Sequence, residues 1–468
     1  MLPLSIHEII KATKGVLLTT AEYDHLVKNI STDTRKLKPD SFFFALRGKN
    51  FDGHNFIKTA VAKGVAGVVI SRRDLKITDA LKKIPVIRVT NTTAALGQLA
   101  SYYRDQLAAL IIAVTGSNGK TTTKNMLAYI LSQNKSVIQS QKSFNNLIGV
   151  SLTLLEADST TEYIILELGS NHPGEIAQLA KISRPHIGII TNISATHLEG
   201  LKNEEGVARE KKTLLEHMDY PAIAIWEAGN HWFNKTKLFN LKRRSKYAEP
   251  TVVTFGIKKG ELAGSDLKIK PNGLEFLVNE KHHCFLPVLG QWNMKNSLAA
   301  LAASSALGFS LNESLLRLKN FRLPPMRMEP SVIKGTTIIN DAYNANPASV
   351  SLAAEELKLM AARGRKIFVL GDMLELGKSS NELHLKTVQR IMESGINALL
   401  CVGKEVKNAF TRLSSQKNTR TQMFHFDSAK DAGNFLAGYL KSKDVVLLKG
   451  SRGIGLETII PYLKRKKK

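Results

Sequence analysis

A glycine-rich loop between an apolar run and a helical pattern is the feature that most constrains this chain of 468 residues. Residues 115–123 read TGSNGKTTT, with LIIAV before them and KNMLAYIL after them. In a strand–loop–helix unit, glycines let backbone N–H groups close around phosphate oxygens, and the helix N-terminus adds partial positive charge. Lys120 would reach the β- and γ-phosphates, and Thr121 could bind Mg²⁺. The loop therefore predicts an ATP site.

This loop departs from the full GxxxxGK[ST] pattern, because Val114 stands where the first glycine belongs. A glycine turn that binds no phosphate is the alternative interpretation. The position of the loop between a strand pattern and a helix pattern argues against that alternative.

Short apolar runs alternate with longer helical patterns along the chain, which predicts an α/β fold with parallel sheets covered on both faces. The runs are SFFFAL, PVIRV, LIIAVTG, YIILELG, HIGIITN, AIAIW, KIFVLGD, NALLCVG and DVVLLKG. The segment LPPMRMEP, at residues 323–330, interrupts helical structure with its prolines. A chain of this length splits into several cores, so we expect domains at residues 1–108, 109–322 and 323–468.

The net charge of +26 invites a nucleic-acid interpretation. Much of that charge is scattered, and the dense runs are short: KRRSK at Lys242–Lys246 and KRKKK at Lys464–Lys468. We interpret them as a solvated loop and a frayed tail. A basic surface would also attract ATP and an anionic substrate, so nucleic acid is not the favoured partner.

Cysteine usage and hydropathy indicate the compartment. Cys284 and Cys401 lie far apart, which argues against a disulfide framework and against a cysteine-based zinc site. The first residues mix charge into the apolar positions, and no run of about eighteen apolar residues follows. We expect a cytoplasmic protein without a membrane span.

Further motifs follow the loop in a fixed order and cover essentially the whole chain. They are Phe144–Val150 (FNNLIGV), Glu167–Asn171 (ELGSN), Asn192–Ile193, Ala195–Gly200 (ATHLEG), Asn293 and Asn296 in GQWNMKNSLAA, Arg327, Asp341–Pro347 (DAYNANP), Gly371–Gly377 (GDMLELG) and Lys449–Gly453 (KGSRG). With the TGSNGKTTT loop, they resemble the Mur ligase family. The resemblance implies a central phosphate-loop domain with a parallel sheet, a C-terminal Rossmann-like domain and a smaller N-terminal α/β domain.

The resemblance also implies an activity, which is ATP-dependent amide-bond formation. A carboxylate at neutral pH needs activation, which ATP supplies by forming an acyl phosphate that an amine then attacks. FNNxIG, YNANP and GDMxELG are most similar to family members that join D-alanyl-D-alanine to UDP-N-acetylmuramoyl-tripeptide, a peptidoglycan precursor. We expect these two compounds and ATP as substrates, and a monomeric enzyme.

The family resemblance also implies a role for individual residues of this chain. The resemblance implies nucleotide contacts from Gly116, Ser117, Asn118, Gly119, Lys120, Thr121, Thr122, Asn293, Asn296, Arg327, Asp341 and Tyr343. It implies two Mg²⁺ sites, built from Thr121, Glu167, His197 and Lys211. Substrate contacts are expected from Thr34, Arg35, Asn145, Asn146, Lys449, Ser451 and Arg452. The residues expected to act in catalysis are Lys120, Lys211, His197 and Arg327. For a lone histidine after a strand, a structural hydrogen bond would otherwise be the preferred interpretation.

Lys211 aligns with a family lysine that is carried as a carbamate. The register rests on residues 206–208, and Lys212 is adjacent. An ammonium beside Mg²⁺ would be repelled, whereas a carbamate offers anionic oxygens that the metal prefers. An ordinary solvated lysine on a helix is the alternative.

Several positions depart from the family pattern. Trp226-Glu227-Ala228 replaces the common Asn-Ala-Asp, Trp292 replaces a histidine, and Thr213 replaces a glutamate. Because the first two positions lie around the nucleotide in the family, we predict that an indole face partly holds the adenine. Two alternatives to this function remain: a related ligase with another amino-acid donor, and a nucleic-acid-binding protein on the same fold.

Overall fold

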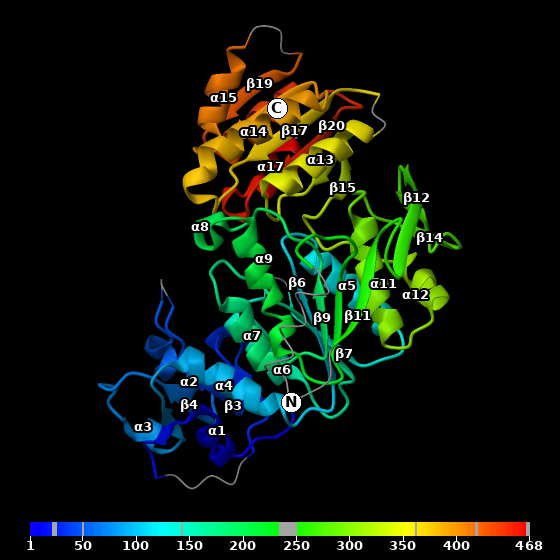
Figure 1. The fold of residues 1–468 in the computed structure, drawn as a ribbon. Helices are drawn as coiled ribbons and strands as arrows, with labels where there is room; N and C mark the ends of the chain where they lie inside the picture. Colours follow the sequence, from blue (N-terminus) through cyan, green and yellow to red (C-terminus); the bar gives the residue numbers. More distant parts are fainter. Residues whose placement is uncertain are drawn as a thin grey trace.

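The computed structural model describes residues 1–20, 26–48, 51–141, 144–233, 250–360, 363–416 and 420–464. It contains three sheets stacked along one long axis, with the N-terminal sheet at one end and the C-terminal sheet at the other (Figure 1). The basic run Lys242–Lys246 and the tail residues 465–468 lie outside the described residues. The expected solvated loop and frayed tail therefore stay predictions.

The N-terminal sheet has five strands in the described part, in the order β1-β5-β4-β3-β2, and β1 alone runs antiparallel to its neighbour. Its elements are α1 (Ile6–Thr13), β1 (Val16–Leu17), β2 (Asn29–Ser31), η1 (Thr34–Lys36), β3 (Ser41–Phe44), η2 (Gly53–Phe56), α2 (Ile57–Ala62), β4 (Gly67–Ile70), α3 (Asp79–Lys82), β5 (Val86–Arg88) and α4 (Thr92–Arg104). Strand β3 is buried along its whole length, as its sequence SFFF requires.

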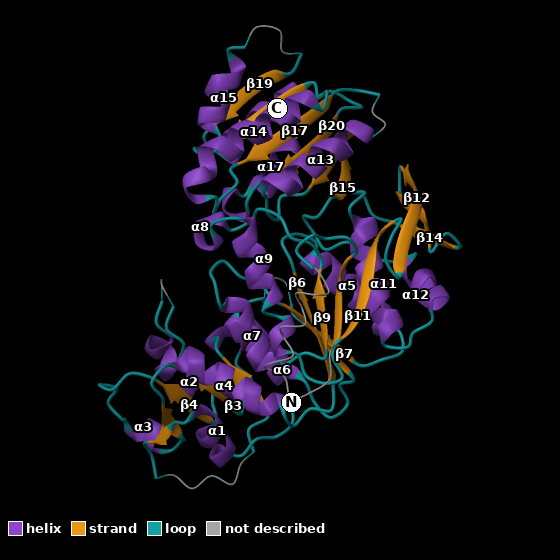
Figure 2. Ribbon diagram, in the orientation of Figure 1, coloured by secondary structure: helices purple, strands orange, loops and turns teal. Residues whose placement is uncertain are grey.

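Nine strands form the central sheet within the described residues, in the order β14-β13-β12-β11-β10-β9-β6-β8-β7. Its elements are β6 (Leu110–Thr115), α5 (Lys120–Leu131), β7 (Val137–Gln139), α6 (Leu147–Glu156), β8 (Tyr163–Glu167), α7 (Glu175–Ser183), β9 (Ile187–Ile190), α8 (Leu198–Leu201), α9 (Glu204–Lys212), η3 (Leu215–His217), β10 (Ile223–Glu227), β11 (Thr251–Ile257), β12 (Leu262–Lys270), β13 (Gly273–Val278), β14 (His282–Leu286), α11 (Asn293–Ala306) and α12 (Leu311–Leu318). Helices α5, α11 and α12 share one apolar core with the sheet, and α4, α6, α7 and α9 share another (Figure 2).

The C-terminal sheet, as far as the structure describes it, has six strands in the order β15-β16-β20-β17-β18-β19. Its elements are β15 (Glu329–Ile333), β16 (Thr336–Asn340), α13 (Pro347–Leu359), β17 (Lys366–Gly371), η5 (Gly377–Ser379), α14 (Ser380–Glu393), β18 (Ala398–Val402), α15 (Lys407–Ser414), β19 (Gln422–Phe426), α16 (Ala429–Tyr439), β20 (Val445–Lys449), η6 (Arg452–Ile454), η7 (Leu456–Thr458) and α17 (Ile459–Lys464). Helices α13, α14 and α15 cover one face and α16 and α17 the other, which is a Rossmann-like arrangement.

The α/β class and the strands expected from the apolar runs are confirmed. The sheets are not parallel throughout: β1 and β15 are antiparallel edge strands, and β12, β13 and β14 form an antiparallel meander at the edge of the central sheet. Gly273 starts β13 with a positive φ of 158°, and a Cβ there would meet the carbonyl oxygen of Leu286 at 2.3 Å. The strand ranges agree with domain limits at residues 108 and 322, which we propose for the chain.

The structure also shows the burial of the two cysteines and the character of the helices. Both cysteines, Cys284 and Cys401, are buried and unpaired. Burial raises the pKa of the Cys284 thiol to about 12, and it also raises that of Cys401. In the described part of the chain, no helix has the length and apolar character needed to cross a membrane.

Candidate active site

A cavity of about 1200 Å³ lies where the central and C-terminal sheets meet. The loop after β6 and the first turn of α11 line it from the central part. Arg327, Asp341 and Tyr343 line it from the C-terminal part, and Thr93 reaches it from α4. The cavity thus gathers residues from all three parts of the chain.

The glycine-rich loop forms one wall, because β6 ends at Thr115 and α5 begins at Lys120. Gly119 has a φ of 83°, and a Cβ there would meet the Oδ1 atom of Asn296 at 2.2 Å. This close approach puts the first turn of α11 directly against the loop. Gly116, with a φ of 140°, takes the other turn that a side chain would strain.

Lys120 folds back over this loop, where its Nζ donates to the carbonyl oxygens of Gly116 at 2.7 Å and Ser117 at 3.1 Å. Burial lowers the pKa of Lys120, while the nearby Glu167 carboxylate raises it. The Lys120 side chain is therefore partly buried, with its ammonium at the loop that we expect to bind phosphate.

The side chains of Ser117, Asn118 and Thr122 in the loop have different surroundings. Ser117 donates to the carbonyl oxygen of Ser194 at 2.8 Å, and Asn118 receives a hydrogen bond from Asn346 at 2.8 Å. Thr122 lines the cavity. The link from Asn118 to Asn346 joins the loop to the C-terminal part, a contact that the sequence motifs did not indicate.

Glu167 and Thr121 form the polar centre of the site. Thr121 donates its hydroxyl to Glu167 Oε2 at 2.7 Å, and Asn145 donates to Oε1 at 3.1 Å. Arg327 reaches across from the C-terminal part and donates to Thr121 Oγ1 at 2.9 Å. A buried carboxylate beside a hydroxyl is a donor set that suits Mg²⁺. Among the described residues, no group of three or more His, Cys, Asp or Glu side chains could hold a metal ion.

His197 lies on the cavity wall but faces the C-terminal part. Its Nδ1 lies 2.6 Å from the Oε2 atom of Glu375, in the loop between β17 and η5. The hydrogen bond from His197 lowers the pKa of Glu375 more than burial raises it. Both residues have a positive φ, 52° and 64°, so two left-handed backbone positions meet here. The structure brings His197 to the carboxylate of Glu375, a pairing that the sequence did not predict.

Lys211 is buried on α9, with its side-chain Nζ donating to the hydroxyl of Ser170 at 2.7 Å. Burial lowers the pKa of Lys211 to about 7, and the positive charge of Lys120 acts in the same direction. Glu210 and Glu175 partly oppose this shift. Its neighbour Lys212 lies over the ring of Phe233 instead, at 5.5 Å from the centroid. The two adjacent lysines therefore occupy different environments.

Lys449 lines the cavity, and its ammonium is bound by groups of the C-terminal part. Its Nζ donates to Asp341 Oδ2 at 2.5 Å and to the Asn344 carbonyl oxygen at 3.2 Å, and the side chain is almost fully buried. Ser451 is also buried, and its hydroxyl accepts a hydrogen bond from the Leu374 N–H. The sequence did not show that Asp341 lies beside Lys449, and the expected substrate contacts of Lys449 and Ser451 stay predictions.

Arg452 and Arg327 present their charges to the cavity. Arg452 is largely exposed and pairs with Glu457 at 2.7 Å. Arg327 stacks on Tyr343, with 4.1 Å from its guanidinium carbon to the ring centroid. In the wall opposite, Asn296 donates to Asn293 at 2.8 Å. Arg327, Arg452, Asn293 and Asn296 all line the cavity, and their expected contacts to nucleotide and substrate stay predictions.

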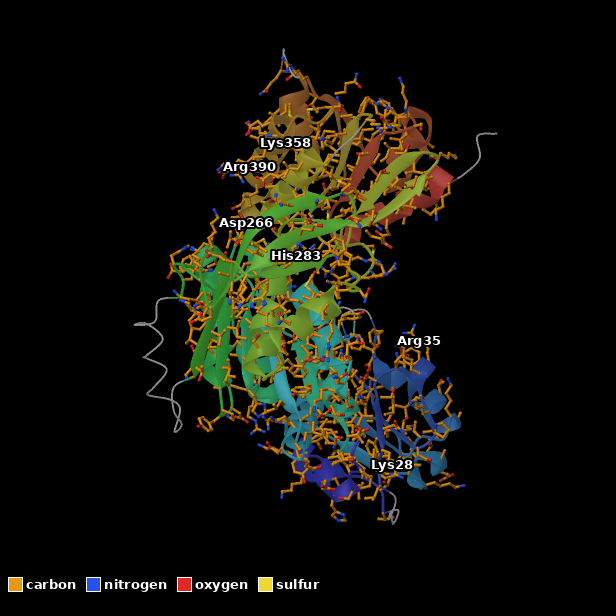
Figure 3. All side chains as sticks on the ribbon, turned by 90° about the vertical axis from the view of Figure 1, so that its right-hand side faces the viewer. Lys28, Arg35, Asp266, His283, Lys358 and Arg390 are labelled. Carbon is orange, nitrogen blue, oxygen red and sulfur yellow. The ribbon has the colours of Figure 1, made fainter. Side chains whose placement is uncertain are left out.

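The residues expected to contact the nucleotide-linked substrate lie in two different regions of the structure. Asn145 and Asn146 line the cavity, and Asn146 also caps α6 by accepting from Gly149 N–H. Thr34 and Arg35 lie in η1 of the N-terminal part and do not line the cavity. Figure 3 shows Arg35 on the surface of that part, and its side chain pairs with Asp33.

Of the positions that depart from the family pattern, some line the cavity and others do not. Trp226 is buried and stacks on Phe233 at 5.3 Å, and it does not line the cavity. Trp292 does line it. Glu227 pairs with Lys295 at 2.6 Å, and both line the cavity. Thr213 only hydrogen-bonds its own helix.

Comparisons with known proteins agree with this arrangement. The chain matches the Mur ligase family catalytic domain over residues 26–104, the Mur ligase middle domain over residues 114–304 and the Mur ligase glutamate ligase domain over residues 326–452. It is 35% identical to the UDP-N-acetylmuramoyl-tripeptide–D-alanyl-D-alanine ligase of Buchnera aphidicola subsp. Baizongia pistaciae, covering 99% of this chain and 98% of that protein. The enzyme of the same name from Bacillus subtilis is 31% identical, with 99% of each chain covered.

Solved structures give the same result. A crystal structure of MurF from Acinetobacter baumannii has a TM-score of 0.88 and 30% identity, with 99% of each chain covered. MurF from Thermotoga maritima in complex with ADP has a TM-score of 0.80 and 25% identity, covering 95% of this chain and 98% of that one. The chain belongs to the Mur ligase family.

Proposed function

We propose that this protein joins D-alanyl-D-alanine to UDP-N-acetylmuramoyl-tripeptide, with ATP converted to ADP and phosphate, in the cytoplasmic synthesis of a peptidoglycan precursor. The observation that carries the proposal is the contact of Arg327 with Thr121, which joins the C-terminal part to the phosphate loop. Full-length similarity to enzymes that bear this name supports the choice of substrates.

The reaction has two steps. The terminal carboxylate of the tripeptide attacks the γ-phosphorus of ATP, which forms an acyl phosphate and releases ADP. The amine of D-alanyl-D-alanine then attacks the acyl carbon, the amide bond forms, and phosphate leaves with the bonding electrons while the amine loses a proton. Lys120 binds the β- and γ-phosphates, and Arg327 stabilises the charge that develops during transfer.

Two Mg²⁺ ions belong to this proposal, and when bound they would neutralise phosphate charge and polarise the transferred group. Thr121 would hold the first of them, and Glu167, which accepts a hydrogen bond from Thr121, would hold the second together with His197. His197 would join only after turning away from Glu375. Asn145 orients the Glu167 carboxylate by its hydrogen bond.

A carbamate on Lys211 is also part of the proposal. Carbon dioxide reacts with a neutral amine, and a pKa of about 7 leaves a large neutral fraction of Lys211 at physiological pH. The amine lies beside Ser170, and that serine lines the cavity. The carbamate would therefore form next to the proposed metal site and present its anionic oxygens to it.

The remaining substrate contacts are assigned by location. Contacts to the peptide portion would come from Asn145, Asn146, Lys449, Ser451 and Arg452, and the cavity that these residues line supports this. Thr34 and Arg35 would hold the uridine diphosphate end from the N-terminal part. Asp341 would contact the ribose of ATP, with Lys449 fixing its carboxylate. We further propose that the enzyme acts as a monomer, which size-exclusion chromatography with light scattering would test.

Phosphate release from ATP is the experiment that tests the function. It would be measured with UDP-N-acetylmuramoyl-tripeptide, with and without D-alanyl-D-alanine. We expect release only when both are present, and a product whose mass equals their sum minus water. Turnover with a different amino-acid donor would identify a related ligase instead. Salt-dependent binding of duplex DNA without turnover would favour the nucleic-acid alternative.

A further inference from the structure

A buried carboxylate outside the described motifs joins the two parts that enclose the cavity. Glu356 lies on α13 of the C-terminal part and has no exposed surface. Its Oε1 accepts a hydrogen bond from the Gly290 N–H at 3.1 Å, and its Oε2 accepts one from the Gln291 N–H at 3.0 Å. Among the residues that the structure describes, no Lys, Arg or His forms an ion pair with it. Burial of an unpaired carboxylate is unfavourable, so hydrogen bonds must hold this one in place.

The two N–H groups lie just before the start of α11 in the central part. Gly290 and Gln291 immediately precede α11, whose N-cap residue, Trp292, makes no side-chain capping bond. The N-terminus of a helix carries partial positive charge, which favours a carboxylate beside it. Glu356, from the C-terminal part, therefore fixes the two residues that lead into α11. The adjacent Leu289 packs into the core of that part.

The first turn of α11 carries the side chains that meet the phosphate loop. Asn293 and Asn296 are joined by a hydrogen bond of 2.8 Å, and Asn296 Oδ1 occupies the space where Gly119 lacks a Cβ. Any shift of this turn would therefore move the wall against which the loop packs.

Helix α13 contacts the central part a second time at its N-terminal end, where Asn346 meets the phosphate loop. Asn346 caps α13 through the Ser349 N–H at 2.9 Å, and its Nδ2 donates to Asn118 of the loop at 2.8 Å. Residues 346 and 356 are separated by about 15 Å along a helix, since each residue rises about 1.5 Å. One helix of the C-terminal part therefore braces two walls of the nucleotide cavity (Figure 1).

We propose that Glu356 is a positioning residue for the nucleotide: by holding the start of α11, it keeps Asn293 and Asn296 against the phosphate loop. The proposal rests on the proposed function only in taking ATP as the nucleotide. Glu356 does not line the cavity and touches no reactant.

The test replaces Glu356 with glutamine. Glu356→Gln keeps the size of the side chain, but its amide NH₂ now faces one of the two backbone N–H groups, so one hydrogen bond becomes a repulsive contact. We expect the KM for ATP to rise by about tenfold or more, which corresponds to the loss of one charge-assisted hydrogen bond. The KM for the UDP-linked substrate should stay unchanged, because that substrate is held largely from elsewhere.

Glu382→Gln is the matched control, because Glu382 lies on α14 of the same part and is exposed, and its ion pair within the described residues is with Lys386. It should leave all kinetic constants unchanged. A purely structural role for Glu356 would lower the folded fraction and reduce kcat alone. Unchanged KM for ATP in Glu356→Gln would overturn the proposal.

A second measurement keeps the outcome clear if Glu356→Gln folds poorly or if the ligase substrates prove wrong. Calorimetric titration with ADP, normalised to the folded fraction, needs no acceptor or amine. Weaker binding of ADP by Glu356→Gln than by wild type supports the proposal even where ligase turnover is absent. Equal binding by the two proteins rejects it, even if ligase activity falls.

Discussion

Lys211 and Lys212 are neighbours on one helix, yet only Lys211 lies buried beside Ser170. We predict that Lys211→Ala lowers turnover by about 100-fold or more, because the metal-binding carbamate is lost. Lys212→Ala should keep most activity. Steady-state phosphate release measures both variants, and added acetate should partly restore Lys211→Ala by filling the vacated metal position. Full activity in both variants, or inactivity in Lys212→Ala alone, would show that the carbamate is not on Lys211.

Lys120 gives a second prediction at this scale. Lys120→Ala should lower kcat by about 100-fold or more, since a positioned charge on the transferred phosphate is lost. Its melting temperature should stay close to that of wild type, because the lysine bonds only to carbonyl oxygens of its own loop. Normal phosphate release by this variant would contradict the assignment of the loop as the ATP site.

The two tryptophans should respond to truncation in opposite ways. Trp226→Ala should destabilise the fold by about 3–5 kcal/mol, as expected for a large buried ring. Trp292→Ala should change the preference for ATP over GTP instead, because its ring lines the cavity. Urea unfolding and competition kinetics separate the two effects. If nucleotide preference is unchanged in Trp292→Ala, its indole is a packing residue only.

At the scale of elements, an ion pair fixes the start of β17 against the turn before β20. The Asp444 carboxylate accepts hydrogen bonds from the side chain and N–H of Arg365 and from the Lys441 N–H. Burial raises the pKa of Asp444, but the hydrogen bonds from Arg365 and Lys441 outweigh it and lower the pKa below 3.8. Its contribution to stability is therefore fully present above pH 3.8 and is lost as the pH falls through the lowered pKa.

Asp444→Asn tests this linkage. The variant should unfold at a lower temperature than wild type at pH 7, with about 1–3 kcal/mol less stability. The difference should shrink as the pH falls below 3.8, where the wild-type carboxylate becomes protonated. Thermal melts across this range measure it. A difference that stays constant with pH would mean that the charge of Asp444 contributes nothing.

The elements that the sequence predicted are those with a strong local pattern. Strands such as β6, β8 and β20 were visible as apolar runs, and the phosphate loop followed from its glycines. The meander of β12, β13 and β14 was missed because its partly exposed strands carry mixed residues. Side-chain partners were harder still. The pairs Lys449–Asp341 and His197–Glu375 join residues more than a hundred positions apart, which no local pattern reports.

At the scale of the whole molecule, the net charge of +26 should act on substrate capture. We predict that the KM values for ATP and the UDP-linked substrate rise several-fold between low salt and about 0.5 M salt, since screening shortens to a few ångströms. The KM for D-alanyl-D-alanine, which carries no net charge, should change little. Initial rates at constant free Mg²⁺ measure the effect. Equal salt dependence for all three substrates would assign it to the protein's conformation instead.

Three side-chain contacts hold the central and C-terminal parts together around the cavity. Arg327 on Thr121, Asn346 on Asn118 and Glu375 on His197 all cross the same boundary. Each of these contacts would be broken if the C-terminal part swung away to admit a nucleotide. The cavity is therefore a property of the assembled chain, and no single sheet with its helices contains it.

The burial of both cysteines has a practical consequence for watching that movement. A thiol reacts with maleimide dyes as the thiolate, and the raised pKa of Cys284 and Cys401 together with their burial keeps both unreactive. Maleimide dyes should therefore not label the wild-type chain. One engineered cysteine on an exposed position of β12 and another on α15 would carry a donor and an acceptor fluorophore without any background (Figure 1). Opening and closing could then be followed by energy transfer in single molecules of an otherwise unaltered enzyme.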